Sequence, residues 1–296
     1  MPTVRDLRDR IRSLKNTQQI TKAMKQVAAS KIRRAEAAQK RARPYADALA
    51  EMLGDLIAAV SSVDHPFMKP GREGAPVGIV LITADKGLAG AFNSNVVAAA
   101  TAFARSQSAV RYYTIGLKAR NAVRRMGMPD HRTWLLGAPS KIHTAREVGH
   151  AVSDDFDRGA ISQIVLVSSK LVTRMSQRPE TRKLVPILTE DLAALRGGRH
   201  PEAKNEGARG AIEFAPSPEF VLTRLLPKYL EFTIYSAMLE TDAAFFAAQI
   251  VAMTNATDNA SNLIDELTID MNNARQAAIT KELLEIVAGA EALGVE

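Results

Sequence analysis

The chain has 296 residues, of which 46% are hydrophobic, 24% are charged and only 5% are aromatic, and it contains no cysteine. This length suffices for one large or two small domains with a buried core, and the lack of cysteine excludes disulfides, thiol catalysis and cysteine-bound zinc. No apolar stretch reaches about 18 residues, so no transmembrane helix is predicted. The polar start lacks the apolar core of a signal peptide, so we expect the protein to stay in the compartment where it is made.

Positive charge is concentrated near the N-terminus. The net charge is +7, but residues 1–43 contain 13 Lys and Arg against three acidic residues, which is +10 and leaves −3 for the rest. Such an asymmetry indicates either a solvated basic helix face or a contact surface for nucleic acid, anionic lipid or an acidic protein. Charge alone leaves these alternatives open.

The first segment is predicted to form one long helix. Residues 3–43 contain neither Gly nor Pro and are rich in good helix formers. The helical pattern continues past Pro44 to Val60, with a kink expected at the proline. The 4-3-4-3 spacing of a coiled-coil seam, with a polar middle, is found at Leu7, Ile11, Leu14, Gln18, Thr21, Lys25, Ala28 and Ile32. A second stripe, offset from this seam, is more apolar and consists of Ile20, Met24 and Val27.

The middle of the chain alternates short apolar runs with helical patterns. A linker rich in Pro and Gly, residues 61–76, precedes this region. The alternation is typical of an open α/β sheet with helices on its faces. Residues 172–188 and 211–222 are expected to form an antiparallel strand pair around a polar, glycine-rich loop. Strands are predicted at 77–83, 110–115 and 161–169, and helices near 93–105, 118–126 and 141–156.

The last segment, residues 228–296, contains no Pro and carries apolar residues at helical spacing. A helix of about 65 residues measures on the order of 100 Å, so it is expected to pack antiparallel against the first helix. The predicted fold is a mixed α/β protein: a long antiparallel coiled coil of the N- and C-terminal helices plus a central, open, Rossmann-like α/β sheet domain. We expect an N-terminal coiled-coil helix at 1–60, a central α/β domain at 77–222 and a C-terminal coiled-coil helix at 223–296.

Two terminal blocks carry a family resemblance. Residues 10–34 (RIRSLKNTQQITKAMKQVAASKIRR) resemble the N-terminal signature of the γ subunits of F-type ATP synthases. The C-terminal signature of that family is similar to residues 253–260 (MTNATDNA), 273–280 (NARQAAIT) and 285–290 (EIVAGA), and residues 85–93 (DKGLAGAFN) are a weaker match. The blocks keep their order over essentially the whole chain, so the resemblance is far more specific than a lone motif.

This resemblance implies a non-catalytic rotor of the central stalk in a proton-translocating ATP synthase. Its partners would be the hexamer of three α and three β subunits, the ε subunit and the ring of c subunits. The coiled coil would turn inside the hexamer and couple ring rotation to ATP synthesis or hydrolysis, while the α/β domain would face ε and the c-ring. The protein would then be peripheral, on the cytoplasmic face of the cell's inner membrane, with no cofactor and no nucleic-acid partner.

The resemblance also implies residues that contact the catalytic ring. Each has a plain structural alternative, which is coil packing for Met24 and a solvated helix face for the others. Lys22 shares the basic face and is a further candidate for an acidic contact. The expected contact residues are Met24, Lys25, Lys31, Arg33 and Arg34 on the first helix, and Arg275, Gln276 and Thr280 on the last.

No catalytic or metal site is predicted. The loop Asp85–Gly90 lacks the G-K-[ST] ending and the G-x-G-x-x-G spacing of phosphate-binding loops. We therefore expect a turn followed by a helix that Asn93 or Ser94 caps. His143 and His150 are seven residues apart with no third ligand in view, and no Ser/His/Asp or paired-carboxylate grouping stands out.

The sequence departs from the family pattern after Met238. Where family members commonly carry a Glu and an Arg, this chain has Phe245 and Gln249. Our hypothesis is that Phe245 and Phe246 replace a charge network with apolar packing against the N-terminal helix.

Two other functions remain as alternatives. A basic coiled-coil protein that binds RNA or DNA would use the same lysines, although no aromatic residue is interleaved before Tyr45. A nucleotide-dependent enzyme in the middle domain has only the sheet architecture in its favour, and a fold does not define a function.

Overall fold

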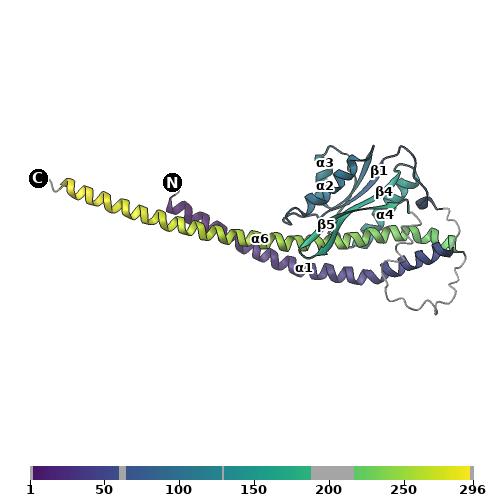
Figure 1. Ribbon diagram of the computed structural model, residues 1–296, viewed down its shortest axis with the longest axis horizontal. Helices are drawn as coiled ribbons and strands as arrows, with labels where there is room; N and C mark the ends of the chain where they lie inside the picture. The colour runs from purple at the N-terminus through teal and green to yellow at the C-terminus, as the bar shows by residue number, and fades with distance from the viewer. Residues whose placement is uncertain (1–2, 60–64, 129, 188–216, 294–296) are drawn as a thin grey trace. The chain divides into compact units, whose positions relative to one another are not determined.

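The computed structural model describes residues 3–59, 65–128, 130–187 and 217–293. The chain divides into two compact units: unit 1 contains residues 1–29 and 249–296, and unit 2 contains residues 30–248. Two long helices, α1 (Val4–Ala59) and α6 (Pro218–Leu293), contribute to both units (Figure 1). The elements between them are the 3-10 turn η1 (Pro66–Met68), β1 (Val77–Ile82), α2 (Phe92–Arg105), β2 (Val110–Ile115), α3 (Leu117–Arg125), β3 (Asp130–Trp134), α4 (Lys141–Asp157), β4 (Gln163–Thr173) and β5 (Ser176–Val185).

Unit 2 is built on a five-stranded sheet in the order β3-β2-β1-β4-β5. The first four strands are parallel, and β5 returns antiparallel to β4 as a hairpin. Parallel neighbours need crossover helices, which is why α2, α3 and α4 separate the strands along the chain. This confirms the mixed α/β fold with a mostly parallel, open sheet.

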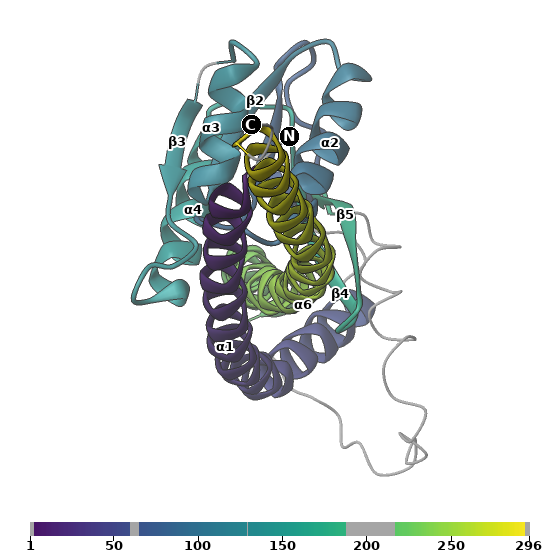
Figure 2. The same ribbon diagram turned by 90° about the vertical axis from the view of Figure 1, so that its left-hand side faces the viewer.

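Alternate residues of the buried strand β1 face two different cores. Ile79 and Leu81 pack with α2 and α3, whereas Val80 and Ile82 pack with α4 and with the helix pair α1 and α6. The period of two along a strand produces this division. In unit 2, α2 and α3 therefore cover the sheet face away from α6, as the end-on view shows (Figure 2).

Within unit 2, α1 and α6 are held by a large apolar core. Leu53 and Leu56 of α1 and Leu222 and Leu226 of α6 are all fully buried in it. This burial explains why α6 tolerates Pro227 in its interior, where a proline costs about 3 kcal/mol in an exposed helix.

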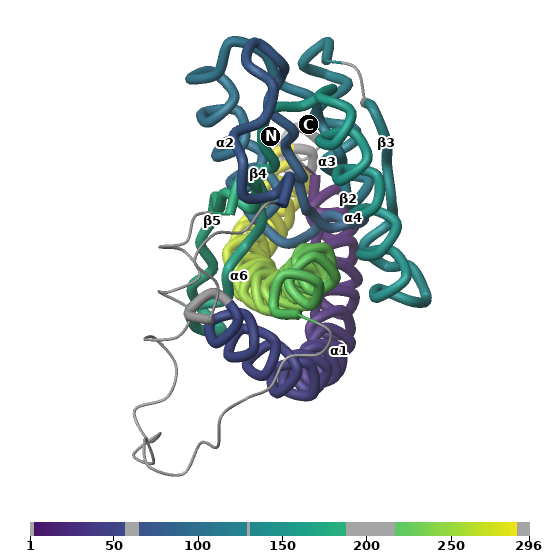
Figure 3. Tube along the Cα trace, turned by 90° about the vertical axis from the view of Figure 1, so that its right-hand side faces the viewer, coloured from purple at the N-terminus to yellow at the C-terminus, as the bar shows by residue number. Residues whose placement is uncertain are grey.

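Unit 1 is a two-helix antiparallel coil, and the Cα trace follows both helices (Figure 3). Its α1 seam is close to the predicted one: Leu7, Ile11, Thr21 and Ala28 are buried, and Leu14 and Gln18 are half-buried. The exception is Lys25, which is exposed, because the half-buried Met24 takes its place in the seam. Of the second stripe, Ile20 and Val27 are exposed.

The junction between β2 and α3 depends on Gly116. This residue has a φ of 100°, and a Cβ atom there would lie 2.1 Å from the carbonyl oxygen of Thr83. The Thr83 hydroxyl in turn accepts a hydrogen bond from the backbone N–H of Ala119, at 2.7 Å, in the first turn of α3. Only glycine fits this close approach, which fixes the start of α3 against the end of β1.

Most element predictions are confirmed within one or two residues, but three are wrong. Over the described residues the predicted pairing of 172–188 with 211–222 is wrong: β5 pairs with β4 and residues 218–222 begin α6, while 188 and 211–216 lie outside the described residues. The last helix begins at Pro218, ten residues before the helical pattern that starts at 228 and five before the predicted bound of 223, because Ser217 caps it and the proline occupies its first turn. Strand β3 was missed because its polar sequence, DHRTW, forms an edge strand with no apolar run.

Candidate functional site

The predicted contact residues of unit 1 fall into two separate groups. Met24 is half-buried in the coil and Lys25 is exposed on α1. Arg275, Gln276 and Thr280 are exposed on α6, where the Thr280 hydroxyl donates to the carbonyl of Gln276. The structure therefore presents four of these five side chains to solvent but does not bring the two groups together.

Among the described residues, the pairing of the coil leaves the end of α6 without a partner helix. Thr21 lies opposite Thr257, and Gln18 lies opposite Ser261. In this antiparallel register the first residue of α1, Val4, falls opposite about Arg275, so about 18 residues of α6, or about 27 Å, extend past it. We call residues 276–293 the α6 overhang.

The α6 overhang carries apolar side chains that no other described residue covers. Ile279, Leu283, Leu284, Ile286 and Val287 are each 50% to 67% exposed. Single exposed apolar residues are ordinary, but a cluster within nine residues of one helix is typical of a contact surface.

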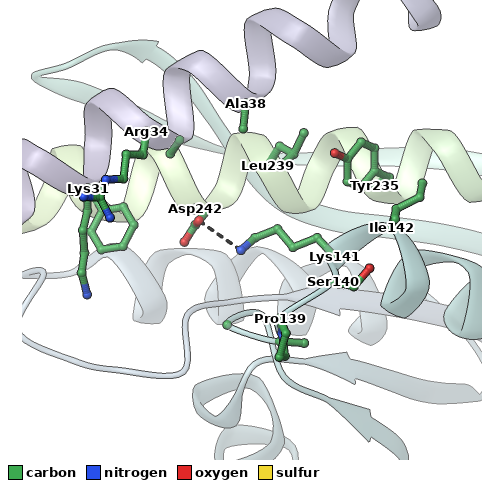
Figure 4. A pocket seen from close by; sticks show the side chains of 14 residues that line it. Lys31, Arg34, Ala38, Pro139, Ser140, Lys141, Ile142, Tyr235, Leu239 and Asp242 are labelled. Atoms are coloured by element: carbon green, nitrogen blue, oxygen red, sulfur yellow. Dashed lines mark ion pairs between the residues drawn. The ribbon is translucent and has the colours of Figure 1, made fainter.

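The other predicted contact residues lie in unit 2, and two of them line one cleft. The cleft has a volume of about 570 Å³, and Lys31 and Arg34 of α1 form one wall (Figure 4). The α6 side chains Tyr235, Leu239, Asp242 and Phe246 form the second wall, and residues 137–142, which lead into α4, form the third. Arg33 is exposed on α1 but does not line the cleft.

Charge in this cleft is mainly positive. Lys141 at the start of α4 pairs with Asp242 at 3.2 Å, and Lys31 lies over the ring of Phe246, 5.5 Å from its centroid. Burial raises the pKa of the Asp242 carboxyl above its usual range, and the nearby Lys141 ammonium opposes this rise. Because Lys141 is paired, Lys31 and Arg34 are the cations that the cleft offers to an acidic group.

The crevice where an α/β sheet of this kind usually binds a ligand is filled by α6. In such folds ligands bind beyond the carboxyl ends of the strands, where the strand order reverses, which here is between β1 and β4. Phe245 packs there against Phe92, with ring centroids 5.8 Å apart, in a cluster with Ala84 and Ala89 after β1. Leu171 of β4 packs against the same cluster.

This arrangement corrects our hypothesis about the two phenylalanines. Phe245 packs against the loop after β1 and the start of α2, not against the N-terminal helix. Only Phe246 reaches α1, through the ammonium of Lys31. The adjacent Phe side chains point to different neighbours because successive residues of a helix lie about 100° apart around its axis.

The loop after β1 is held by the side chains of Asp85 and Asn93. The Asp85 carboxylate accepts hydrogen bonds from the backbone N–H groups of Leu117, Leu136 and Gly137, at 3.1, 3.3 and 2.7 Å. The predicted cap of α2 is wrong, since neither candidate makes a side-chain cap. Asn93 instead accepts from the N–H of Ala84 at 3.0 Å and closes the loop.

A buried polar network lies between the sheet and α4, where sequence patterns gave no signal. Asp155 of α4 accepts a hydrogen bond from the Tyr113 hydroxyl, and it lies 3.1 Å from His131 Nε2 and 3.5 Å from Arg111. Burial raises the pKa of Asp155, but the Tyr113 hydrogen bond and the charges of His131 and Arg111 outweigh it, so the pKa is lowered. Burial and Asp155 also raise the pKa of Tyr113.

In the described part of the chain, no group of three His, Asp or Glu side chains is arranged to hold a metal ion. Likewise, none of the described helices is both long and apolar enough to cross a bilayer. His143 and His150 contact Glu147 and Glu231, respectively.

An exposed apolar helix end and a ligand crevice filled by the chain's own side chain are features of a shaft-type subunit that works inside a larger assembly. The sequence model of the ATP synthase family matches residues 3–293. The ATP synthase gamma chains of Pelotomaculum thermopropionicum and Heliobacterium modesticaldum are 44% and 42% identical to this chain, over 99% of it and 100% of each relative. The chain belongs to the ATP synthase γ-chain family. It is a non-catalytic rotor subunit of the central stalk, and these relatives give no support to the nucleic-acid alternative.

Solved structures agree on the fold. The chain is similar to one from the Euglena gracilis mitochondrial ATP synthase (OSCP/F1/c-ring, rotational state 3), with a TM-score of 0.65 and 18% identity over 98% of this chain and 94% of that one. A chain from the Tetrahymena thermophila mitochondrial ATP synthase (central stalk/c-ring) gives a TM-score of 0.59 and 24% identity, over 80% and 99%.

Proposed function

We propose that this chain is the shaft that couples rotation of a c-ring to the catalytic hexamer of α and β subunits in a proton-translocating ATP synthase. The observation that carries the proposal is the α6 overhang, a single helix with five exposed apolar side chains and no partner helix. A helix of this kind is stable only when another protein surrounds it.

The contact surfaces follow from this role. The α6 overhang, with Arg275, Gln276 and Thr280 at its base, would turn inside the hexamer. Lys31 and Arg34 would receive acidic segments of the ring at the unit 2 cleft, with Met24, Lys25 and Arg33 along the same helix. Charges at such rims orient partners more than they add affinity.

The sheet unit would face the ε subunit and the c-ring. In this proposal the functional parts are the coil segments 1–60 and 223–296 and the α/β domain 77–222. The complex would hold the chain as a peripheral component at the cytoplasmic face of the cell membrane, with no membrane contact of its own.

The test is reconstitution of the full chain with isolated α and β subunits and Mg-ATP. We expect one copy per three α and three β subunits and stimulated ATP hydrolysis over the ring alone. A chain that ends at residue 275 should keep its thermal stability and lose the stimulation. Failure of the full chain to assemble, where a known γ chain assembles, would refute the proposal.

A further inference from the structure

A second basic surface lies far from the N-terminal helix. Residues 86–128 contain seven Lys and Arg and no Asp or Glu, a net charge of +7 that equals the net charge of the whole chain. The net charge of all residues after 43 is −3, because acidic residues outside 86–128 outweigh these seven cations. Four of the seven cations lie on α3, which has nine residues and no acidic one: Lys118, Arg120, Arg124 and Arg125.

Helix α3 separates its apolar and basic residues onto two faces. Ala119, Ala122 and Val123 are buried, with Ala119 and Val123 packed in the core between helix and sheet. Lys118 and Arg125 are exposed, as is Arg124. The basic face therefore points away from the sheet and from the core that α3 covers.

The α3 cations have no acidic partner among the residues that the structure describes. The Arg125 Nε–H donates only to the carbonyl of Asn121 in its own helix, at 3.2 Å. Some other cations of unit 2 are paired: Arg174 binds Glu36 through two hydrogen bonds of 2.9 and 2.7 Å, and Lys141 and Lys228 pair with Asp242 and Glu231. What distinguishes α3 is that four cations lie on nine residues that include no acidic side chain.

Helix stability does not account for this charge. Arg124 and Arg125 lie in the last turn, where cations interact favourably with the helix dipole. Lys118 lies in the first turn, where the same dipole disfavours it, and Arg120 and Arg124 are like charges at i and i+4, which destabilise a helix. Lys118 and the repulsion between Arg120 and Arg124 therefore weaken the helix that carries them.

We propose that the exposed face of α3 is a docking surface for a carboxylate-rich segment of a partner protein. Guanidinium groups match carboxylates in a planar, two-pronged geometry, and three of the four cations are arginines. A lipid surface fits less well, because α3 exposes no large apolar side chain that could enter a membrane. The proposal rests on the proposed function only in expecting that the partner is another subunit of the synthase.

The first test compares two variants of the full chain that lose the same charge. K118Q/R124Q/R125Q removes three exposed cations from α3, and R5Q/R8Q/R12Q removes three exposed cations from α1. The probe is a fluorescent decaglutamate peptide at low and high salt. We expect the α3 variant to lose about tenfold in affinity and the α1 variant to stay within about twofold of the parent chain.

Either of two outcomes overturns the proposal. Equal losses in both variants would mean that net charge alone attracts the peptide. Binding of the α3 face to vesicles of equal parts phosphatidylglycerol and phosphatidylcholine, without binding to the peptide, would assign the surface to lipid. Circular dichroism and thermal unfolding of each variant exclude a loss of fold as the cause.

The second test identifies the partner inside the assembled complex. Because the chain contains no cysteine, Arg124→Cys creates a unique attachment point for a photo-crosslinker. We expect a cross-link to a segment rich in Asp and Glu, identified by mass spectrometry. Assembly without any such cross-link would refute the α3 surface and leave the rotor function standing, whereas failure to assemble would concern the rotor function instead.

Discussion

The two units of this chain share the same two helices but stabilise them in different ways. In unit 2, α1 and α6 bury leucines such as Leu53 and Leu226 in a core that also contains α4 and the sheet. In unit 1, the same helices meet through smaller or polar residues, including Ala28, Thr21 and Thr257. The apolar side chains that unit 1 does have at its end are exposed.

This difference indicates that one part of the helix pair provides stability and the other part provides contacts with partner subunits. A large buried core makes an element resistant to local opening, whereas a thin seam of small residues leaves an element near the low end of stability. We therefore expect unit 2 to resist local opening more strongly than unit 1, and we expect partner subunits to cover the exposed end of unit 1. Substitutions in unit 2 should therefore lower mainly the free energy of unfolding, whereas substitutions at the exposed end of unit 1 should weaken mainly assembly.

The largest effect on stability is expected in unit 2, at Phe245. Phe245→Ala removes a buried ring that packs on Phe92 and should lower the free energy of unfolding by about 3–5 kcal/mol. Phe246→Ala, at the half-buried neighbour, is the matched control and should cost about 1 kcal/mol. Urea unfolding measures both, and an equal or larger cost at Phe246 would contradict the crevice packing.

A smaller, pH-dependent effect is expected at Asp155. Because its folded pKa is lowered, its ionised form stabilises the protein above the unfolded pKa of about 3.9, and this contribution is lost as the pH falls through the folded value. Asp155→Asn should cost about 2 kcal/mol at pH 7. The difference from the parent chain should shrink below about pH 4 in urea titrations. A difference that is constant with pH would mean that packing, not charge, is responsible.

The polar pair in unit 1 should show coupled and modest effects. The Thr21 and Thr257 hydroxyls lie 2.7 Å apart in the buried seam. Thr21→Val or Thr257→Val alone should cost about 1 kcal/mol, but the double variant should cost less than the sum, because each single variant already removes the contact between the two hydroxyls, while each hydroxyl also bonds a carbonyl of its own helix, that of Gln18 or Met253. Thr17→Val, an exposed threonine on α1, serves as the control. Strictly additive costs would show that the two hydroxyls do not interact.

The smallest effect on stability is expected in the α6 overhang. Leu283→Ala with Leu284→Ala should change the free energy of unfolding by less than about 0.5 kcal/mol, because both side chains are exposed. The same variant should weaken assembly with α and β subunits, measured by the yield of the complex. Glu282→Ala, on an exposed residue next to them, should leave assembly unchanged. A loss of stability without a loss of assembly would reverse our assignment of the overhang.

The sequence was most informative where one physical signal dominated. The continuous apolar run at β1 predicted a buried strand, and the heptad spacing from Leu7 to Ile32 predicted the seam at all positions but Lys25. It failed where tertiary contacts override local preference. The burial of Leu222 and Leu226 allows α6 to continue through Pro227, and edge strand β3 has no apolar pattern to find.

The candidate site was only partly accessible to sequence reasoning. Basic residues on α1 could be named, but their grouping at a cleft depends on the approach of Asp242 and the turn before α4. The Asp155 network joins residues of β2, β3 and α4 that are far apart in the sequence, so no local residue spacing predicts it. The α3 charge was visible in the sequence, but its isolation from acidic partners is a property of the fold.

Gly116 has a consequence for how α3 meets other molecules. Since the glycine and the Thr83 hydroxyl hold the first turn of α3 against β1, the helix cannot roll or slide without breaking the sheet edge. The Cα positions that carry its cations therefore keep their spacing before any partner arrives. The backbone of such a helix loses little conformational entropy on binding, so the entropic cost of docking is confined to ordering the Lys and Arg side chains.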